Sequence, residues 1–211
     1  MSEAAADVGV LQREMSSYLA DGFSLRSWLL TTDHKRIAML YMASITVFFF
    51  IGGSAAALIR YNLIVPGGML PSAETYNRLF TMHGVIMVWF FLVPAVPVTL
   101  GNFLVPLMLG ARDLAFPKIN LMSWYLFVGA GIFAVYSLFA GGVDTGWTFY
   151  TPLSTHYALG HVVPIAAAVF IAGFSTIATG LNFIVTIHRL RAPGLTWYRL
   201  PIFIWSMYST S

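Results

Sequence analysis

The stretch Met39–Ile59, MLYMASITVFFFIGGSAAALI, contains 21 residues without a single Asp, Glu, Lys or Arg. As an α-helix it would be roughly 31 Å long, because each residue adds about 1.5 Å. That length matches the hydrocarbon core of a bilayer, which is roughly 30 Å thick. The stretch therefore predicts a transmembrane helix.

The composition of the whole chain agrees with a membrane protein. Of the 211 residues, 58% are hydrophobic and only 9% are charged, whereas about 25% are charged in soluble domains. Cysteine is absent, which excludes disulfides, thiolate metal sites and nucleophilic thiols. The net charge of +3 comes from scattered basic residues, so nucleic acid is not an expected partner. Residues 1–38 are mixed and polar, unlike a cleavable signal peptide.

Three further uncharged runs predict three more membrane helices. Together with the first they are expected at about 39–59, 79–100, 119–140 and 162–187. The second should end near its prolines, between Pro94 and Pro106, and leave a partly buried connector. The last stretch, PIFIWSMYSTS from Pro201, covers only about 16 Å as a helix and is interpreted as the start of a fifth, truncated span. A re-entrant or interfacial segment is the alternative.

The predicted fold is therefore an all-α integral membrane protein, a bundle of four transmembrane helices plus the start of a fifth, after an N-terminal segment 1–38. Lys and Arg are distributed unevenly between its two sides. Alternate connectors carry nine basic residues on the side of the N-terminus and two on the other side. The positive-inside rule then predicts a cytoplasmic N-terminus in a bacterial inner membrane.

His83 is the most informative polar residue within a predicted span. It lies in FTMHGVIMVW, residues 80–89, in the outer part of the bilayer under the predicted orientation. An unpaired imidazole there would cost several kcal/mol, so His83 needs a partner. It could be a structural histidine bonded to another helix, a proton relay, or an iron or copper ligand. His34, in TTDHKR, is expected to be solvated or to face lipid headgroups.

Asp113 is the most informative acidic residue. It follows the second predicted helix in GARDLAFPKIN, where a solvated loop carboxylate is the simplest interpretation. Amides and hydroxyls accompany it on the predicted cytoplasmic half of the bundle, and such groups can hold a line of water or can simply bridge helices. These residues are Asn102, Asn120, Ser175, Thr176 and Asn182.

Two further candidate residues lie near the predicted outer interface. Arg60 can extend to the headgroups, or it can donate charge-assisted hydrogen bonds to a cofactor near His83. Trp147, in the connector after the third helix, is typical of an interfacial aromatic belt. Spacing alone does not decide between these roles.

Five segments resemble subunit I of the haem-copper terminal oxidases, which include the cytochrome c and quinol oxidases. They cover most of residues 31–205, and the second and third are the most specific. The segments read TTDHKRIAMLY (31–41), FTMHGVIMVWFFLVP (80–94), GNFLVPLMLGARDLAFPKIN (101–120), TGWTFYTPLS (145–154) and GLNFIVTIHRLRAPGLTWYRLPIFIW (180–205).

The resemblance implies roles for the residues above. His83 matches an axial ligand of the low-spin haem iron, of a or b type. Arg60 matches the arginine that bonds a substituent of that haem, and Trp147 matches a tryptophan near the haem propionates. Asp113 matches the carboxylate at the mouth of the D proton pathway. The five amide and hydroxyl residues named with it match or neighbour the polar lining of that pathway.

The family's subunit has twelve helices, so the resemblance also implies missing parts. The copper site, the high-spin haem and the second axial histidine would come from segments beyond Ser211, and the chain alone is expected to be inactive. The implied function is reduction of O2 to water coupled to proton pumping. Cytochrome c is favoured over quinol as electron donor, and subunits II and III and membrane lipid are implied partners. The alternatives are a non-catalytic scaffold or accessory subunit with the same fold, and a proton-relay transporter without haem.

Overall fold

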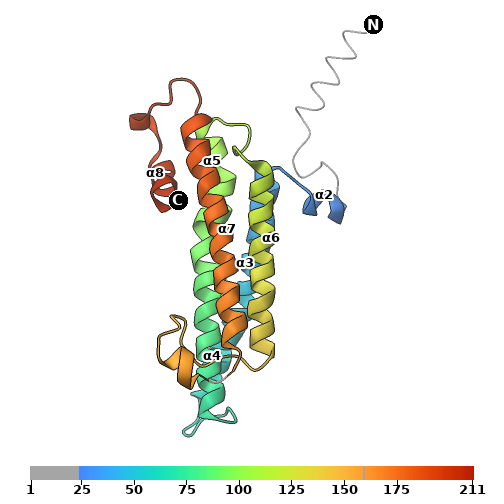
Figure 1. The fold of residues 1–211 in the computed structure, drawn as a ribbon, viewed down its shortest axis with the longest axis vertical. Helices are drawn as coiled ribbons and strands as arrows, with labels where there is room; N and C mark the ends of the chain where they lie inside the picture. Colours follow the sequence, from blue (N-terminus) through green and yellow to red (C-terminus); the bar gives the residue numbers. More distant parts are fainter. Residues whose placement is uncertain (1–23, 159) are drawn as a thin grey trace.

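Four long helices form the body of the protein. The computed structural model describes residues 24–158 and 160–211. Within them, four helical segments are long and apolar enough to cross a membrane, which confirms the predicted four-span bundle. They run side by side along the long axis of the molecule (Figure 1). Their bounds are His34–Asn62, Ala73–Leu109, Pro117–Phe139 and Val162–Arg189.

The first, third and fourth spans are the continuous helices α3 (His34–Asn62), α6 (Pro117–Phe139) and α7 (Val162–Arg189). The second span is composed of four consecutive helical segments: α4 (Ala73–Val85), η1 (Ile86–Leu92), η2 (Ala95–Leu100) and α5 (Gly101–Leu109). Shorter helices complete the described chain: α2 (Leu25–Leu29), η3 (Leu153–Tyr157), η4 (Trp197–Arg199) and α8 (Ile202–Thr210).

Side-chain caps explain why α3 and α4 begin before the apolar runs that predict them. Asp33 accepts hydrogen bonds from the backbone N–H groups of Lys35 and Arg36, at 2.8 and 3.0 Å. Ser72 accepts one from the N–H of Thr75 at 3.2 Å. Such caps satisfy the unpaired N–H groups of a first helical turn, so that turn can be polar. α3 therefore begins inside the predicted N-terminal segment 1–38.

The second span corrects the prediction that its helix ends near residue 100. The chain stays helical to Leu109, through Pro94, Pro97 and Pro106. The wide π-helical segments η1 and η2 lie on either side of Pro94, and such local widening accommodates prolines that lack an N–H. Backbone groups at membrane depth need internal hydrogen bonds, which favours continued helix over an irregular connector.

The bundle is packed by aromatic rings and by small residues. The ring of Phe48 on α3 lies 5.2 Å from that of Phe90 on η1 and 5.6 Å from that of Phe127 on α6. Gly131 on α6 leaves room for Phe48, because a Cβ at this glycine would lie 2.0 Å from the ring. Close helix contact at small residues is typical of membrane bundles.

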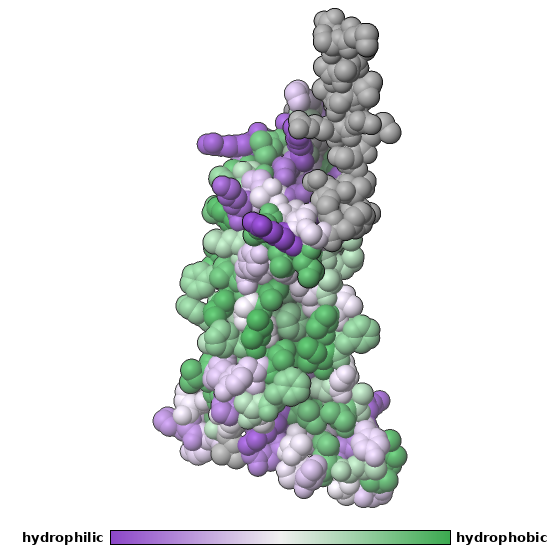
Figure 2. Space-filling model, turned by 90° about the vertical axis from the view of Figure 1, so that its right-hand side faces the viewer, coloured by the Kyte–Doolittle hydropathy of each residue, from purple (hydrophilic) through white to green (hydrophobic). Residues whose placement is uncertain are grey.

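The surface is divided as a membrane protein requires. Hydrophobic residues cover the middle of the face shown in Figure 2, and hydrophilic residues gather toward both ends. Large apolar side chains point outward from the helices, such as Phe170 on α7, which is 67% exposed. Apolar surface of this kind suits the hydrocarbon region of a bilayer. The protein is therefore a multi-pass membrane protein.

The two ends of the bundle differ in charge. One end holds the starts of α3 and α6 and the ends of α5 and α7, and the other holds the end of α3 and the start of α4. At the first end, the connectors and first turns of the described chain between residues 33 and 199 carry seven Lys and Arg residues. The other end carries two, Arg60 and Arg78. The fold thus keeps the asymmetry on which the predicted orientation depends.

Candidate functional site

His83 lies on α4 and contacts the neighbouring span through one ring nitrogen. Its Nδ1 is 2.9 Å from the backbone oxygen of Gly52 on α3. A carbonyl oxygen can only accept, so Nδ1 carries the hydrogen and donates it. The lone pair of Nε2 is then available to a metal or another donor, an arrangement common among histidines that bind metals.

Close backbone contacts fix the surroundings of this histidine. A Cβ at Gly52 would lie 2.8 Å from the Met87 sulfur, and a Cβ at Gly84 would lie 3.2 Å from the Cβ of Trp147. The N–H of Gly146, next to Trp147, donates to the hydroxyl of Thr81 at 3.1 Å. The structure therefore brings Trp147 beside the helical turn that carries His83.

Arg60 is not brought together with His83 in the described residues. It is exposed near the end of α3, eight positions beyond Gly52, which corresponds to about 12 Å along the helix axis. It lies at the end of the bundle where α3 ends and α4 begins. A contact with the same ligand as His83 would need a group large enough to cover that distance.

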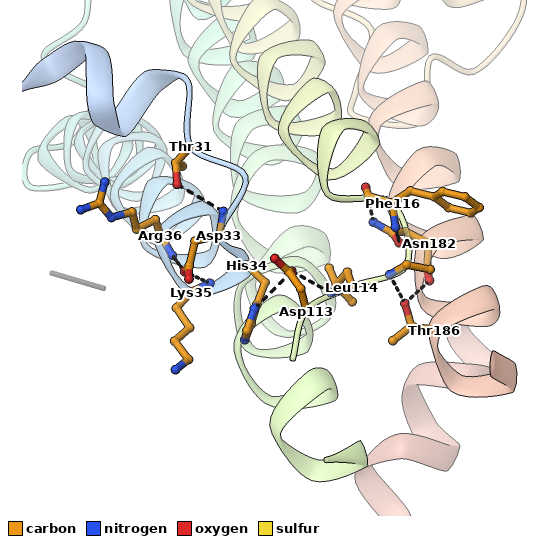
Figure 3. Close-up of polar contacts among 11 residues, drawn as sticks. Thr31, Asp33, His34, Lys35, Arg36, Asp113, Leu114, Phe116, Asn182 and Thr186 are labelled. Atoms are coloured by element: carbon orange, nitrogen blue, oxygen red, sulfur yellow. Dashed lines mark hydrogen bonds and ion pairs between the residues drawn. The ribbon is translucent and has the colours of Figure 1, made fainter. Parts of the chain in front are cut away.

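The surroundings of Asp113 correct the prediction for His34. Instead of facing solvent or headgroups, His34 is only 2% exposed, and its Nδ1 lies 3.3 Å from Oδ1 of Asp113. That separation is within ion-pair range, but the angles do not make a hydrogen bond. Asp113 itself is 31% exposed and accepts a hydrogen bond from the N–H of Leu114 at 2.7 Å (Figure 3).

The connector after Asp113 is held by α7. The N–H of Phe116 donates to Oδ1 of Asn182 at 2.9 Å, and Nδ2 of Asn182 donates to the Phe116 carbonyl at 3.0 Å. The N–H of Ala115 donates to the hydroxyl of Thr186 at 2.9 Å. The contacts of Asn182 and Thr186 with this connector are drawn in Figure 3. Asn182 thus bridges a helix to a loop, the second of the two interpretations that the sequence left open for the amides.

Asn102 on α5 and Asn120 on α6 differ from Asn182. Both are completely buried. Asn102 donates to the Val98 carbonyl at 2.6 Å, while its Oδ1 and both polar atoms of the Asn120 side chain have no hydrogen-bond partner. Buried amides are nearly always hydrogen-bonded, to protein or to ordered water. These atoms are therefore suited to hold buried water.

A cluster of hydroxyl groups joins α3, α6 and α7 inside the bundle. The Tyr41 hydroxyl donates to Oγ of Ser123 at 2.8 Å and lies 3.2 Å from Oγ of Ser175. Ser123 donates to the carbonyl of Asn120 at 2.7 Å. Ser175 and Thr176 also line a cavity of about 300 Å³. The predicted Ser175 therefore belongs to this cluster, which adds Tyr41 and Ser123, whereas the Thr176 hydroxyl donates to the Ala172 carbonyl of its own helix at 3.1 Å.

The sequence contains a signal that could have found Tyr41 and His34. The buried residues of α3 recur every three or four positions, which is the pattern of one helix face. His34 and Tyr41 fall on that face together with Gly52. A polar residue in such a stripe faces the bundle and not the lipid.

Metal-liganding side chains are sparse in this part of the chain. In the ranges that the structure describes, no three of His, Cys, Asp and Glu lie close enough together to hold a metal ion.

Comparison with known proteins identifies the family. The sequence profile described as Cytochrome C and Quinol oxidase polypeptide I matches residues 36–211. The chain belongs to this family. The resemblance found from the five segments is thereby confirmed, and so is the expectation of an oxidase subunit I fold.

Three curated relatives of the oxidase family show how much of the protein is covered. Cytochrome c oxidase subunit 1 of Bacillus subtilis is 42% identical over 192 residues, covering 90% of this chain and 30% of the relative. Probable cytochrome c oxidase subunit 1-beta of Nocardia farcinica is 44% identical over 199 residues, or 90% of this chain and 33% of the relative. Heme-copper oxidase subunit I+III of Aeropyrum pernix is 40% identical over 187 residues, or 87% and 23%. The chain spans a third or less of these relatives.

Proposed function

We propose that this chain supplies the first helices of the catalytic subunit of a respiratory terminal oxidase, which reduces O2 to water and pumps protons. Its membership of the oxidase family and its positively charged bundle end support this function. Cytochrome c is the preferred electron donor, since two of the three relatives described above are named as cytochrome c oxidases. The oxidase would lie in a bacterial inner membrane with the N-terminus in the cytoplasm.

The observation that carries the proposal is the hydrogen bond from His83 Nδ1 to the Gly52 carbonyl. It holds the imidazole in one tautomer and leaves Nε2 available, so that His83 would hold the iron of a low-spin haem of a or b type. Such a haem supplies one-electron transfer. Trp147 would border the haem edge, and Arg60 would reach only a ring substituent that extends toward the end of α3.

The second part of the proposal is a proton pathway that begins at Asp113. The carboxylate is partly exposed at the positive end of the bundle, so it can exchange protons with water. Water bound to Asn102 and Asn120 would continue the line to Tyr41, Ser123 and Ser175, and Thr176 lines the cavity beyond them. Asn182 supports the pathway indirectly, because it holds the loop that presents Asp113.

Copper, a high-spin haem and subunits II and III would complete the enzyme. One relative is described as subunit I+III, which supports a subunit III neighbour. The same fold without haem would indicate a scaffold or accessory subunit instead. The test of the function is therefore the visible spectrum of the purified complex that contains this chain.

The His83→Ala variant should lose the low-spin haem absorbance, while His156→Ala should retain it. His156 is a matched control because it is exposed in η3 at the same end of the bundle. A spectrum that His83→Ala leaves unchanged would contradict the ligand assignment. A complex without any haem absorbance would contradict the oxidase itself.

For the pathway, Asp113→Asn should slow turnover and abolish most proton pumping in reconstituted vesicles. Asp144→Asn is the control, since Asp144 lies at the opposite end of the bundle, where it accepts a hydrogen bond from Asn77 at 3.3 Å. Equal pumping by the Asp113 variant and the unmodified enzyme would rule out this pathway.

A further inference from the structure

A basic cavity lies at the end of α7, at the same end of the bundle as Asp113, and its lining shares no residue with the proposed haem and proton sites. Its volume is about 390 Å³, and His188, Arg189, Arg191 and Trp197 are among the residues that line it. All its lining residues belong to the described chain between residues 188 and 197, and none of them is acidic. The cavity therefore favours an anionic ligand.

One of the two arginines that line the cavity, Arg191, is held by an aromatic stack. The guanidinium carbon of Arg191 lies 4.3 Å from the centroid of the Trp197 ring, a cation–π arrangement. The Trp197 ring lies 5.0 Å from the ring of His188, whose Nε2 is 3.1 Å from the Tyr208 hydroxyl on α8. Because these contacts fix the guanidinium plane before any ligand binds, less side-chain entropy is lost on binding.

The hydrogen-bonding capacity of Arg191 is incompletely used. Its Nη1 is buried and has no hydrogen-bond partner, while the residue as a whole is partly exposed and lines the cavity. A planar guanidinium presents donors in a fork that matches two oxygens of a phosphate. Arg189, exposed on the same rim, adds a second positive charge.

The cavity lies at the level of lipid headgroups. The span α7 ends at Arg189, and the N–H of Ala192 donates to the carbonyl of Leu109, the last residue of α5, at 2.9 Å. Beyond η4, α8 presents apolar surface, with Ile202 86% exposed. Charged groups beside an apolar face suit an amphiphile better than a free anion.

We propose that this cavity binds the phosphate group of an anionic glycerophospholipid, with the guanidinium of Arg191 as the main donor and Arg189 as a second charge. The acyl chains would lie along the exposed side of α8. Basic pockets at the ends of membrane helices are typical binding sites for such headgroups. This site is independent of the haem and proton proposals, since none of its residues takes part in them.

The test uses the purified complete complex that contains this chain, exchanged into a neutral detergent. Native mass spectrometry would count lipids retained after titration with phosphatidylglycerol or with phosphatidylcholine. We expect retention of phosphatidylglycerol in excess over phosphatidylcholine. Arg191→Gln should weaken that retention about fivefold, the effect of one basic residue at an anionic lipid.

Matched variants separate position from charge. Arg199→Gln removes an exposed basic residue of the same loop that does not line the cavity, and it should leave retention unchanged. Trp197→Leu keeps every charge but removes the ring under Arg191, so it should give a smaller loss than Arg191→Gln. A loss with Arg199→Gln as large as with Arg191→Gln would overturn the site.

Two further outcomes would also overturn the proposal. Equal retention of the two lipids by the unmodified complex would show that no anionic headgroup is recognised, for instance because another segment covers the cavity. Displacement of phosphatidylglycerol by an equal concentration of inorganic phosphate would indicate a site for free anions. The first of these measurements needs no variant, so it remains decisive even where a substitution prevents assembly.

Discussion

The side-chain amide of Asn182 makes two hydrogen bonds with the backbone of Phe116, one as donor and one as acceptor, at 3.0 and 2.9 Å. Through this pair, α7 positions the connector that carries Asp113. The amide is completely buried, so it is shielded from competition by bulk water. A residue expected to line a proton pathway thus holds in place the loop that carries Asp113.

Replacing Asn182 with Ala should loosen that loop. The N–H of Phe116 would lose its partner, whereas the Phe116 carbonyl would keep the hydrogen bond from the N–H of Asn120 at 3.0 Å. Each hydrogen bond lost costs about 1 kcal/mol. Hydrogen–deuterium exchange of the purified complex should show faster exchange in residues 113–117. Asn77→Ala is the control, because its hydrogen bond to Asp144 is exposed. Unchanged exchange in the loop would show that the hydrogen bonds of Asn182 do not restrain it.

Replacing Gly52 with Ala should disturb the position of His83, although the atoms nearest to the added methyl group belong to other residues. The added methyl group would meet the Met87 side chain at 2.8 to 2.9 Å and Ile86 at 3.2 Å, so α3 and η1 must move apart or Met87 must shift. A longer bond from His83 Nδ1 to the carbonyl makes the imidazole a weaker donor to iron. On the haem proposal, the midpoint potential of the low-spin haem should therefore rise in a spectroscopic redox titration.

Gly53→Ala provides the comparison, since a Cβ there would meet nothing within 4 Å. This variant should keep the original potential. Combining Gly52→Ala with Met87→Ala should restore it as well, because the second change removes the side chain that blocks the methyl group. A shift of equal size in both single variants would disprove a contact-specific effect.

Replacing Gly131 with Ala should destabilise the bundle. The new Cβ would lie 2.0 Å from the Phe48 ring, and such overpacking costs about 1 to 3 kcal/mol. The midpoint temperature of the detergent-solubilised complex should fall. Gly129→Ala on the same helix is the matched control, with no atom within 4 Å of its Cβ. The variant Phe48→Leu should recover part of the loss, and no recovery would point to a different cause.

On the proton-pathway proposal, replacing Tyr41 with Phe should slow proton uptake while leaving the packing intact. The ring fills the same buried volume, but Ser123 and Ser175 lose the hydroxyl that lies 2.8 and 3.2 Å away. Flow–flash measurement of proton uptake in the intact complex should show the slower phase. Tyr125→Phe is the control, since the Tyr125 hydroxyl donates to the Leu29 carbonyl outside this cluster. Equal uptake rates in the two variants would remove Tyr41 from the pathway.

Much of the fold follows from the sequence because hydrophobic length is a strong constraint in membranes. The uncharged runs near Met39, Ile119 and Val162 each correspond to a helix in the structure. The helix ends were less predictable. The second span continues past Pro94 and Pro97 to Leu109, because local π-helical widening accommodates prolines that normally end a helix. Sequence composition does not predict such widening.

The candidate site likewise follows in part from the sequence and in part only from the tertiary structure. The sequence by itself determined which residue types are costly at membrane depth, and so selected His83, Asn102 and Asn120 as residues that need partners. Only the tertiary structure decided what those partners are, because each contact joins helices far apart in the sequence. It paired His83 with Gly52, buried His34 beside Asp113, and assigned Asn182 to the backbone of Phe116. Hydrogen bonds depend on direction and on distances of about 3 Å, which a one-dimensional pattern does not contain.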